Sequence, residues 1–79
     1  MSLYPTPTRL ALLADVAYGE ITRDGDGDSW NARHYKMTSR IEELEQAGWV
    51  ELASATSDML PVWRLTDAGT GVLAAAVTS

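Results

Sequence analysis

MTSRIEELEQAGWVEL, residues 37–52, contains the clearest pattern in this chain of 79 residues. Its apolar residues recur at the three- and four-residue spacing of one face of a helix: Met37, Ile41 and Leu44. This spacing predicts a helix over about residues 35–47, and Gly48 directly after it is typical of a left-handed C-terminal cap. Residues 49–52, Trp-Val-Glu-Leu, have the composition of a strand. The segment therefore predicts a helix that turns directly into a strand.

A second strand and a last helix are predicted beyond this segment. Residues 61–65, Pro-Val-Trp-Arg-Leu, are rich in apolar residues and are expected to pair with the first strand in an antiparallel hairpin over about residues 49–65. Thr66 can cap the last helix through its hydroxyl. Gly69 and Gly71 each cost about 1 kcal/mol relative to alanine in an exposed helix interior, so this helix is expected to depend on docking to the core.

The N-terminal half predicts one helix, a short strand and a loop. Thr8 follows two prolines and can cap a helix over residues 9–18. Residues 20–22, Glu-Ile-Thr, favour a short extended segment, and residues 24–28, Asp-Gly-Asp-Gly-Asp, are typical of a solvated loop. A short helical turn is expected over residues 30–34. Because the chain has no phenylalanine, two tryptophans are expected in the core, and the third is expected to be exposed: Trp49 and Trp63, and then Trp30.

This order of elements resembles that of a winged helix-turn-helix domain. Residues 37–52 look like the recognition helix and first wing strand of MarR-like and PadR-like transcriptional regulators, and residues 63–73, WRLTDAGTGVL, are similar to the second wing strand and following helix of those families. The resemblance implies an α+β fold: a single small winged helix-turn-helix domain over residues 1–79, with about three to four helices and a two- or three-stranded antiparallel wing sheet. The recognition helix then spans about residues 35–47 and the wing about residues 49–65.

The same resemblance implies a function and reveals one departure from the family pattern. Regulators of this kind bind double-stranded DNA sequence-specifically, so this chain is expected to be a transcriptional regulator. Residues 24–35, DGDGDSWNARHY, stand where these regulators have a full second helix, which is expected here to be one or two turns long or absent. Two copies on adjacent half-sites would add contacts to DNA, so a homodimer through residues 1–6 and 73–77 is a candidate assembly.

Candidate DNA contacts are concentrated around the predicted recognition helix. Residues 29–41 contain three basic and no acidic residues, although the formal net charge of the chain is -5. A step of about 100° per residue places Ser39 on the outer face of the helix and Lys36 and Arg40 on its flanks. The candidate DNA-binding residues are Arg33, His34, Lys36, Thr38, Ser39 and Arg40, together with Arg64 on the second wing strand. Arginine and lysine bind phosphate or guanine, and hydroxyls donate to phosphate oxygens or base edges.

Two alternatives stand beside this interpretation. The basic side chains can pair with nearby carboxylates in surface ion pairs, for instance Arg40 with Glu43. The acidic balance of the chain and the glutamates of the predicted recognition helix would also suit a winged-helix module that binds another protein and does not bind DNA directly. A contiguous exposed surface that joins residues 33–40 to Arg64 would favour DNA over a protein partner.

Composition argues against other classes of site. The chain has no cysteine, which excludes disulfides, thiolate metal sites and cysteine nucleophiles, and a cytoplasmic location is expected by default. No apolar run approaches the ~20 residues that a membrane-spanning helix needs, so no membrane partner is expected. Asp24, Asp26 and Asp28 alternate as in a calcium loop, but Ser29 and Tyr35 stand where that loop requires glycine and glutamate. No metal, cofactor or catalytic residue is predicted, and the chain is not expected to be an enzyme.

Overall fold

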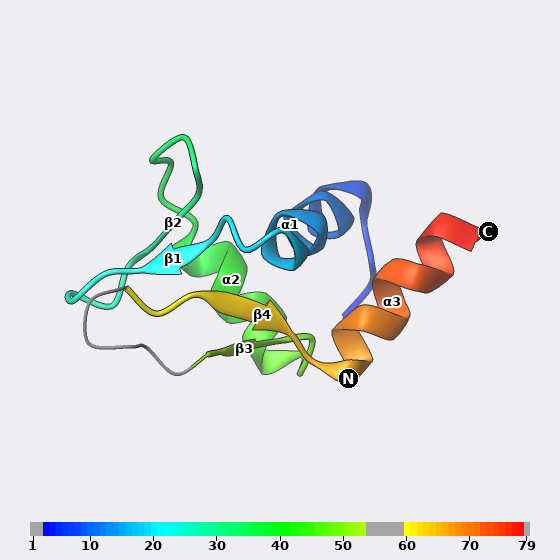
Figure 1. The fold of residues 1–79 in the computed structure, drawn as a ribbon. Coiled ribbons are helices and arrows are strands. Elements are labelled where there is room, and N and C mark those ends of the chain that lie inside the picture. Colours follow the sequence, from blue (N-terminus) through cyan, green and yellow to red (C-terminus); the bar gives the residue numbers. More distant parts are fainter. Residues whose placement is uncertain (1–2, 54–59, 79) are drawn as a thin grey trace.

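The computed structural model describes residues 3–53 and 60–78, and this part of the chain forms three helices and two small antiparallel sheets (Figure 1). The elements in chain order are α1 (Pro7–Ala17), β1 (Thr22–Arg23), β2 (Ser29–Trp30), α2 (Thr38–Gln46), β3 (Val50–Leu52), β4 (Trp63–Leu65) and α3 (Asp67–Thr78). The α+β class predicted from the sequence is therefore confirmed. Residues 54–59 of the predicted wing loop and residues 1–2 of the candidate dimer contact lie outside the described residues.

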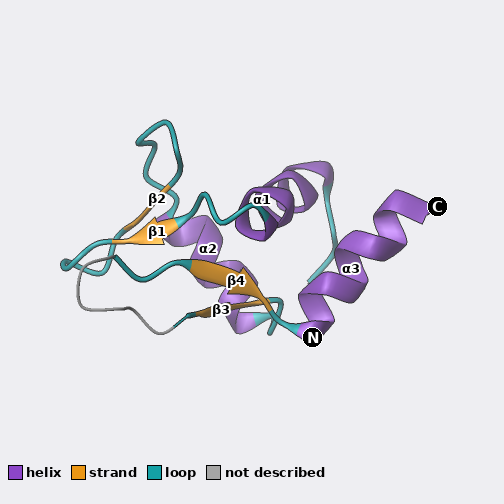
Figure 2. Cartoon of the chain, in the orientation of Figure 1, coloured by secondary structure: helices purple, strands orange, loops and turns teal. Residues whose placement is uncertain are grey.

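The arrangement of the helices and strands along the molecule can be followed in Figure 2. In Figures 1 and 2, α3 lies at one end and the turn between β1 and β2 lies at the other, with α1 and α2 between them. Within the described ranges, no helix has the length and the apolar composition needed to cross a bilayer.

The two sheets are joined along their edges by β1. In one sheet β1 pairs with β2, with Thr22 opposite Trp30, and in the other β3 pairs with β4, with Val50 opposite Leu65. A further antiparallel bridge pairs Thr22 with Val62, just before β4. Backbone hydrogen bonds of 2.9 and 3.0 Å on either side of this bridge hold β1 against the chain that leads into β4. The two hairpins therefore share one hydrogen-bonded framework.

The hydrophobic core lies between the helices and the strands. Its buried side chains come from α1, the residue before β1, α2 and the β3–β4 hairpin with the residue before it: Leu12, Leu13, Val16, Ile21, Ile41, Leu44, Trp49, Val50 and Trp63. Ile41 and Leu44 lie on the buried face of α2, as their spacing predicts, and the two tryptophans expected in the core are there. Ser29 is also buried, and its hydroxyl oxygen accepts a 2.8 Å hydrogen bond from Trp63 Nε1. The polar group of the buried indole is thus satisfied.

The N-terminal end of α1 differs from the prediction. The helix begins at Pro7, and its cap is Thr6, whose Oγ1 accepts a hydrogen bond from Arg9 N at 3.3 Å. The predicted cap at Thr8 is therefore wrong by two residues. Proline is favourable in the first turn because its missing N–H would have no acceptor there, so the helix can begin at Pro7 itself and not after it.

The ends of α2 and α3 follow from local chemistry. Gly48 has a φ of 80° directly after the α2 cap residue, as the sequence predicts. Thr66 Oγ1 accepts from Gly69 N at 3.1 Å, so the predicted cap of α3 is confirmed. α2 begins three residues later than predicted, because Lys36 is still extended and forms a bridge with Trp30.

The acidic segment after β1 is a compact turn organised by Asp24. Asp24 N donates to Asp28 O at 2.8 Å, and Asp24 Oδ1 accepts from the N–H groups of Asp26 and Asp28, both at 2.9 Å. Gly27 has a φ of 88°, which suits glycine. Trp30 Nε1 donates to Asp24 Oδ2 at 2.7 Å and is the main reason that the pKa of Asp24 is lowered. Trp30 is half-buried, and the expectation that it is exposed is wrong.

A second turn with the same hydrogen-bond pattern follows β2. Asn31 N donates to Tyr35 O at 3.1 Å, and Asn31 Oδ1 accepts from Arg33 N and Tyr35 N, both at 2.9 Å. His34 has a φ of 63° and occupies the position equivalent to the glycine of the first turn. The helical turn predicted over residues 30–34 is therefore wrong. The side chain of Asn31 binds the N–H groups that a helix would pair otherwise, and a left-handed residue cannot continue a right-handed helix.

Candidate nucleic-acid interface

The N-terminal end of α2 carries no side-chain cap. Met37 occupies the cap position and makes no side-chain hydrogen bond, and the first turn contains no acidic residue. Ile41 N donates to Met37 O at 2.9 Å, so the N–H groups before Ile41 have no intrahelical acceptor. Residues 36–40 line a shallow depression at this end. Such a helix end favours a negatively charged group, because the helix dipole and the free N–H donors act in the same direction.

Two of the seven candidate residues are held by Asp28. Thr38 Oγ1 donates to Asp28 Oδ1 at 3.1 Å and accepts from Ser29 N at 2.9 Å. Lys36 Nζ lies 3.4 Å from the same carboxylate oxygen, although its side chain is exposed. These contacts fasten the start of α2 to β2. Thr38 therefore has a structural role, and the charge of Lys36 is matched by Asp28.

Arg64 is paired across the β3–β4 hairpin. It lies directly opposite Glu51 in the strand register, and Arg64 Nε is 2.7 Å from Glu51 Oε1. Both side chains are exposed, so the pair contributes about 1 kcal/mol or less to stability. The positive charge of this wing candidate is balanced by a neighbouring carboxylate.

The four remaining candidates are exposed, and no ion pair holds them within the described residues: Arg33, His34, Ser39 and Arg40. The first two lie in the second turn, and the last two lie in the first turn of α2. The structure thus divides the sequence-predicted set into four exposed residues and three that have partners.

Arg9 of α1 takes the partner that the sequence suggests for Arg40. Arg9 Nε donates to Glu43 Oε1 at 2.8 Å, and Arg9 Nη1 donates to Tyr4 O at 2.9 Å. The alternative in which Arg40 pairs with Glu43 is therefore not what the structure shows. The hydrogen bond from Arg9 also lowers the pKa of Glu43, so this carboxyl stays ionised. Nothing in the local sequence indicates a role for Arg9, because its partner lies 34 residues away.

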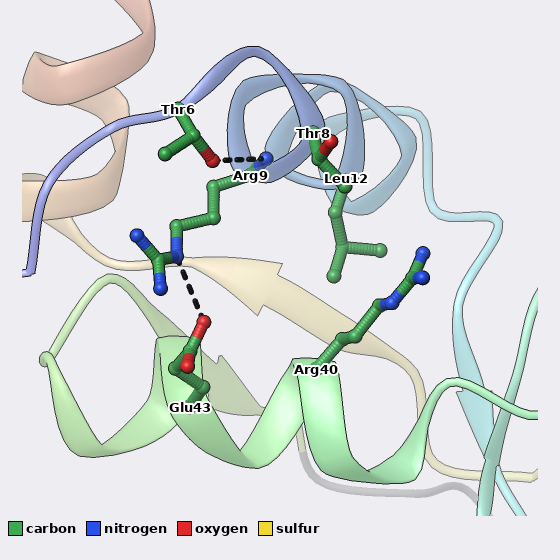
Figure 3. Close-up of a pocket in the computed structure, with 6 residues that line it drawn as sticks. All are labelled: Thr6, Thr8, Arg9, Leu12, Arg40 and Glu43. Carbon is green, nitrogen blue, oxygen red and sulfur yellow. Dashed lines mark hydrogen bonds and ion pairs between the residues drawn. The ribbon is translucent and has the colours of Figure 1, made fainter.

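A groove between the start of α1 and α2 lies beside this ion pair. It is lined by Thr6, Thr8, Arg9, Leu12, Arg40 and Glu43. Figure 3 shows Arg9 and Glu43 turned toward each other, with Leu12 between this pair and the Arg40 side chain. Arg40 borders both this groove and the depression at the start of α2.

Carboxylates border the exposed cations on two sides. Glu42 and Glu45 are exposed on α2 itself. A second groove between α1 and the second turn places Arg33 near acidic side chains, and it is lined by Asp15, Glu20, Asn31, Ala32, Arg33 and Tyr35. Apart from the exposed Arg23 of β1, the unpaired basic side chains of the described residues therefore lie at the start of α2 and in the second turn.

The described residues contain no cluster of three metal-ligating side chains. Comparisons of the chain with protein-family models, curated proteins and solved structures found no match. Any function is therefore inferred from the arrangement of these side chains.

Proposed function

We propose that this chain is a winged helix-turn-helix domain, similar to those of MarR-like and PadR-like regulators, that binds double-stranded DNA sequence-specifically in transcriptional control. α2 is the recognition helix in this proposal, and the β3–β4 hairpin is the wing. The order of the helices and strands supports it, as does the pairing of β1 with the chain that leads into β4. The second turn stands in the place of the second helix.

The single observation that carries the proposal is the chemistry at the start of α2. This helix end is uncapped, and the exposed Ser39 and Arg40 lie in its first turn. Two carboxylates near it are already occupied: Asp28 by Lys36 and Thr38, and Glu43 by Arg9. A DNA phosphate can therefore approach the helix end without meeting an unpaired carboxylate in its first turn.

The major groove of DNA is wide enough for one α-helix, and its base edges differ in their pattern of donors and acceptors. With the first turn of α2 in the groove, Ser39 and Arg40 reach base edges or phosphates, and Arg33 and His34 reach the backbone beyond the helix end. Glu42 and Glu45 lie farther along α2 and restrict the DNA to its N-terminal half. Specificity then depends on few contacts.

The test is a titration of fluorescent duplexes enriched from a random-sequence pool, measured by anisotropy at low and at physiological salt. We expect Arg33→Gln and Arg40→Gln to weaken binding, and a lost phosphate contact to reduce the slope of log K against log salt by ~1. Arg64→Gln is the matched control, because it removes the same charge from a residue that is already paired. Equal affinities for the wild type, Arg33→Gln and Arg40→Gln would refute the proposal.

A protein-interaction module is the second candidate, favoured by Glu42 and Glu45 on the exposed side of α2. These carboxylates would attract a basic partner surface. The variant E42Q/E45Q separates the two functions. It should leave DNA binding unchanged or strengthen it, whereas it should weaken the binding of a basic protein partner. Loss of a partner in this variant, with no DNA binding by the wild type, would favour the second candidate.

A homodimer on DNA belongs to the same proposal. Val77 near the end of α3 is 78% exposed, so an apolar side chain of the candidate contact is accessible. Sedimentation of the chain with and without a bound duplex measures the stoichiometry. A one-to-one complex of nanomolar affinity at physiological salt would exclude the dimer.

A further inference from the structure

The groove between α1 and α2 contains two arginines whose states differ (Figure 3). Arg9 already has an anionic partner, because its guanidinium donates to Glu43 at 2.8 Å and also to Tyr4 O at 2.9 Å. Arg40 has no carboxylate partner within the part of the chain that the structure describes. One cation of this groove is therefore free to bind a ligand.

The surroundings of Arg40 favour an anion. The hydroxyl of Thr8 lines the same groove and is exposed, and it makes no hydrogen bond to any described residue. Glu43 is neutralised by Arg9 and therefore repels an anion less than an unpaired carboxylate would. Leu12 is 4% exposed and forms part of the groove between the polar side chains. Guanidinium and hydroxyl groups that line one groove, as those of Arg40 and Thr8 do, are the donors that proteins use for phosphate oxygens.

We propose that this groove holds one backbone phosphate of the DNA bound at α2, with Arg40 and the Thr8 hydroxyl donating to it. This inference rests on the proposed function and extends it to α1, to which the sequence assigns no DNA contact. Arg40 then binds phosphate and does not bind a base. The phosphate is then held by Thr8 on α1 as well as by Arg40 on α2, and the Arg9–Glu43 pair fastens these two helices together. A phosphate held in this way fixes how far α2 enters the major groove.

The test is a double-mutant cycle with Thr8→Val and Arg40→Gln, measured by DNA anisotropy across a salt series. Each single variant should weaken binding about 5- to 10-fold, the effect of one charge-assisted hydrogen bond. The double variant should lose less than the product of the two losses, because both side chains share one phosphate. Arg40→Gln should lower the salt slope by ~1, and Thr8→Val should not change it. The control is Thr70→Val, which alters an exposed threonine of α3 outside the groove.

The outcomes separate this inference from the function on which it rests. If the wild type and Arg33→Gln differ in DNA affinity but Thr8→Val matches Thr70→Val, the phosphate site is wrong and the DNA-binding function stands. If the wild type binds no duplex, both are wrong. A titration with inorganic phosphate, followed by the amide signals of Thr8 and Arg40, distinguishes the source of the anion. Saturation by free phosphate that DNA does not compete with would overturn the DNA assignment, whereas displacement by DNA supports it.

Discussion

Replacing each of two glycines of α3 by alanine should change the stability of the fold in opposite directions. A Cβ atom at Gly69 would lie 1.9 Å from Trp49 O and 2.8 Å from Trp49 C, whereas a Cβ at Gly71 would have no heavy atom within 4 Å. Gly69 is buried and Gly71 is exposed. The same substitution therefore tests a close backbone approach at one position and helix propensity at the other.

The magnitudes follow from these distances. Gly71→Ala should stabilise the chain by up to about 1 kcal/mol, the propensity difference in an exposed helix. At Gly69 the same gain is opposed by main-chain atoms of Trp49, whose carbonyl oxygen also accepts from Thr66 N at 3.0 Å. Relieving the overlap requires α3 to move away from Trp49, and overpacking of this kind costs about 1–3 kcal/mol. We expect a net loss for Gly69→Ala of up to about 2 kcal/mol, a large part of the roughly 5 kcal/mol that a small domain has.

The assay is thermal unfolding of the wild type and both variants, followed by circular dichroism. A change of 1 kcal/mol corresponds to about 4–8 °C in Tm for a domain of this size, so the two variants should lie on opposite sides of the wild type. Urea denaturation gives the same order independently. If Gly69→Ala is as stable as Gly71→Ala, then α3 does not pack against the backbone of Trp49, and the docking of this helix is wrong.

Three further predictions concern the turns and the core. His34→Gly should be neutral or stabilising and His34→Val should cost about 1–2 kcal/mol, because φ is 63° there; equal Tm values for the two variants would contradict this. Trp30→Phe removes the hydrogen bond that lowers the pKa of Asp24. The lowered pKa of Asp24 stabilises the folded state at pH values above its ordinary pKa of 3.8, and this stabilisation is lost as the pH falls through the lowered pKa. In urea titrations, the difference in stability between the wild type and the variant should therefore disappear at acid pH. Leu44→Ala should cost ~2–5 kcal/mol, because Leu44 is 0% exposed; a Tm shift of a degree or two would show that the buried face of α2 is wrong.

The parts of the fold that were predicted correctly have local causes. The face of α2 is set by the spacing of its apolar residues, and its end is set by Gly48, which alone accepts the left-handed φ of 80° at low cost. The cap of α3 requires a hydroxyl at Thr66 and an N–H three residues later. Each of these features depends on residues within one or two turns of one another, so the sequence contains the whole interaction.

The second turn could not be predicted in the same way, although the first turn, which has the same hydrogen-bond pattern, could. Gly27 shows in the sequence that the first turn has a left-handed position, but His34 occupies the equivalent position without this signal. Asn31 organises the second turn through its side-chain oxygen, as Asp24 organises the first. An Asp or Asn followed three residues later by glycine or another residue that tolerates a positive φ is the pattern that both share. It indicates a turn where composition alone suggests a short helix.

The candidate site was predicted only as a cluster of charges, because its electrostatics depend on partners far along the chain. All six basic residues of the chain lie in the described part, and three of them pair with carboxylates: Arg9, Lys36 and Arg64. That leaves Arg23 of β1 and the candidate residues Arg33 and Arg40 to contact DNA, against the 6–10 phosphate contacts of strongly salt-dependent binders. With two or three contacts, the slope of log K against log salt should be only about -2 to -3. DNA binding by this acidic chain must therefore depend more on the fit of the start of α2 to its site than on long-range attraction.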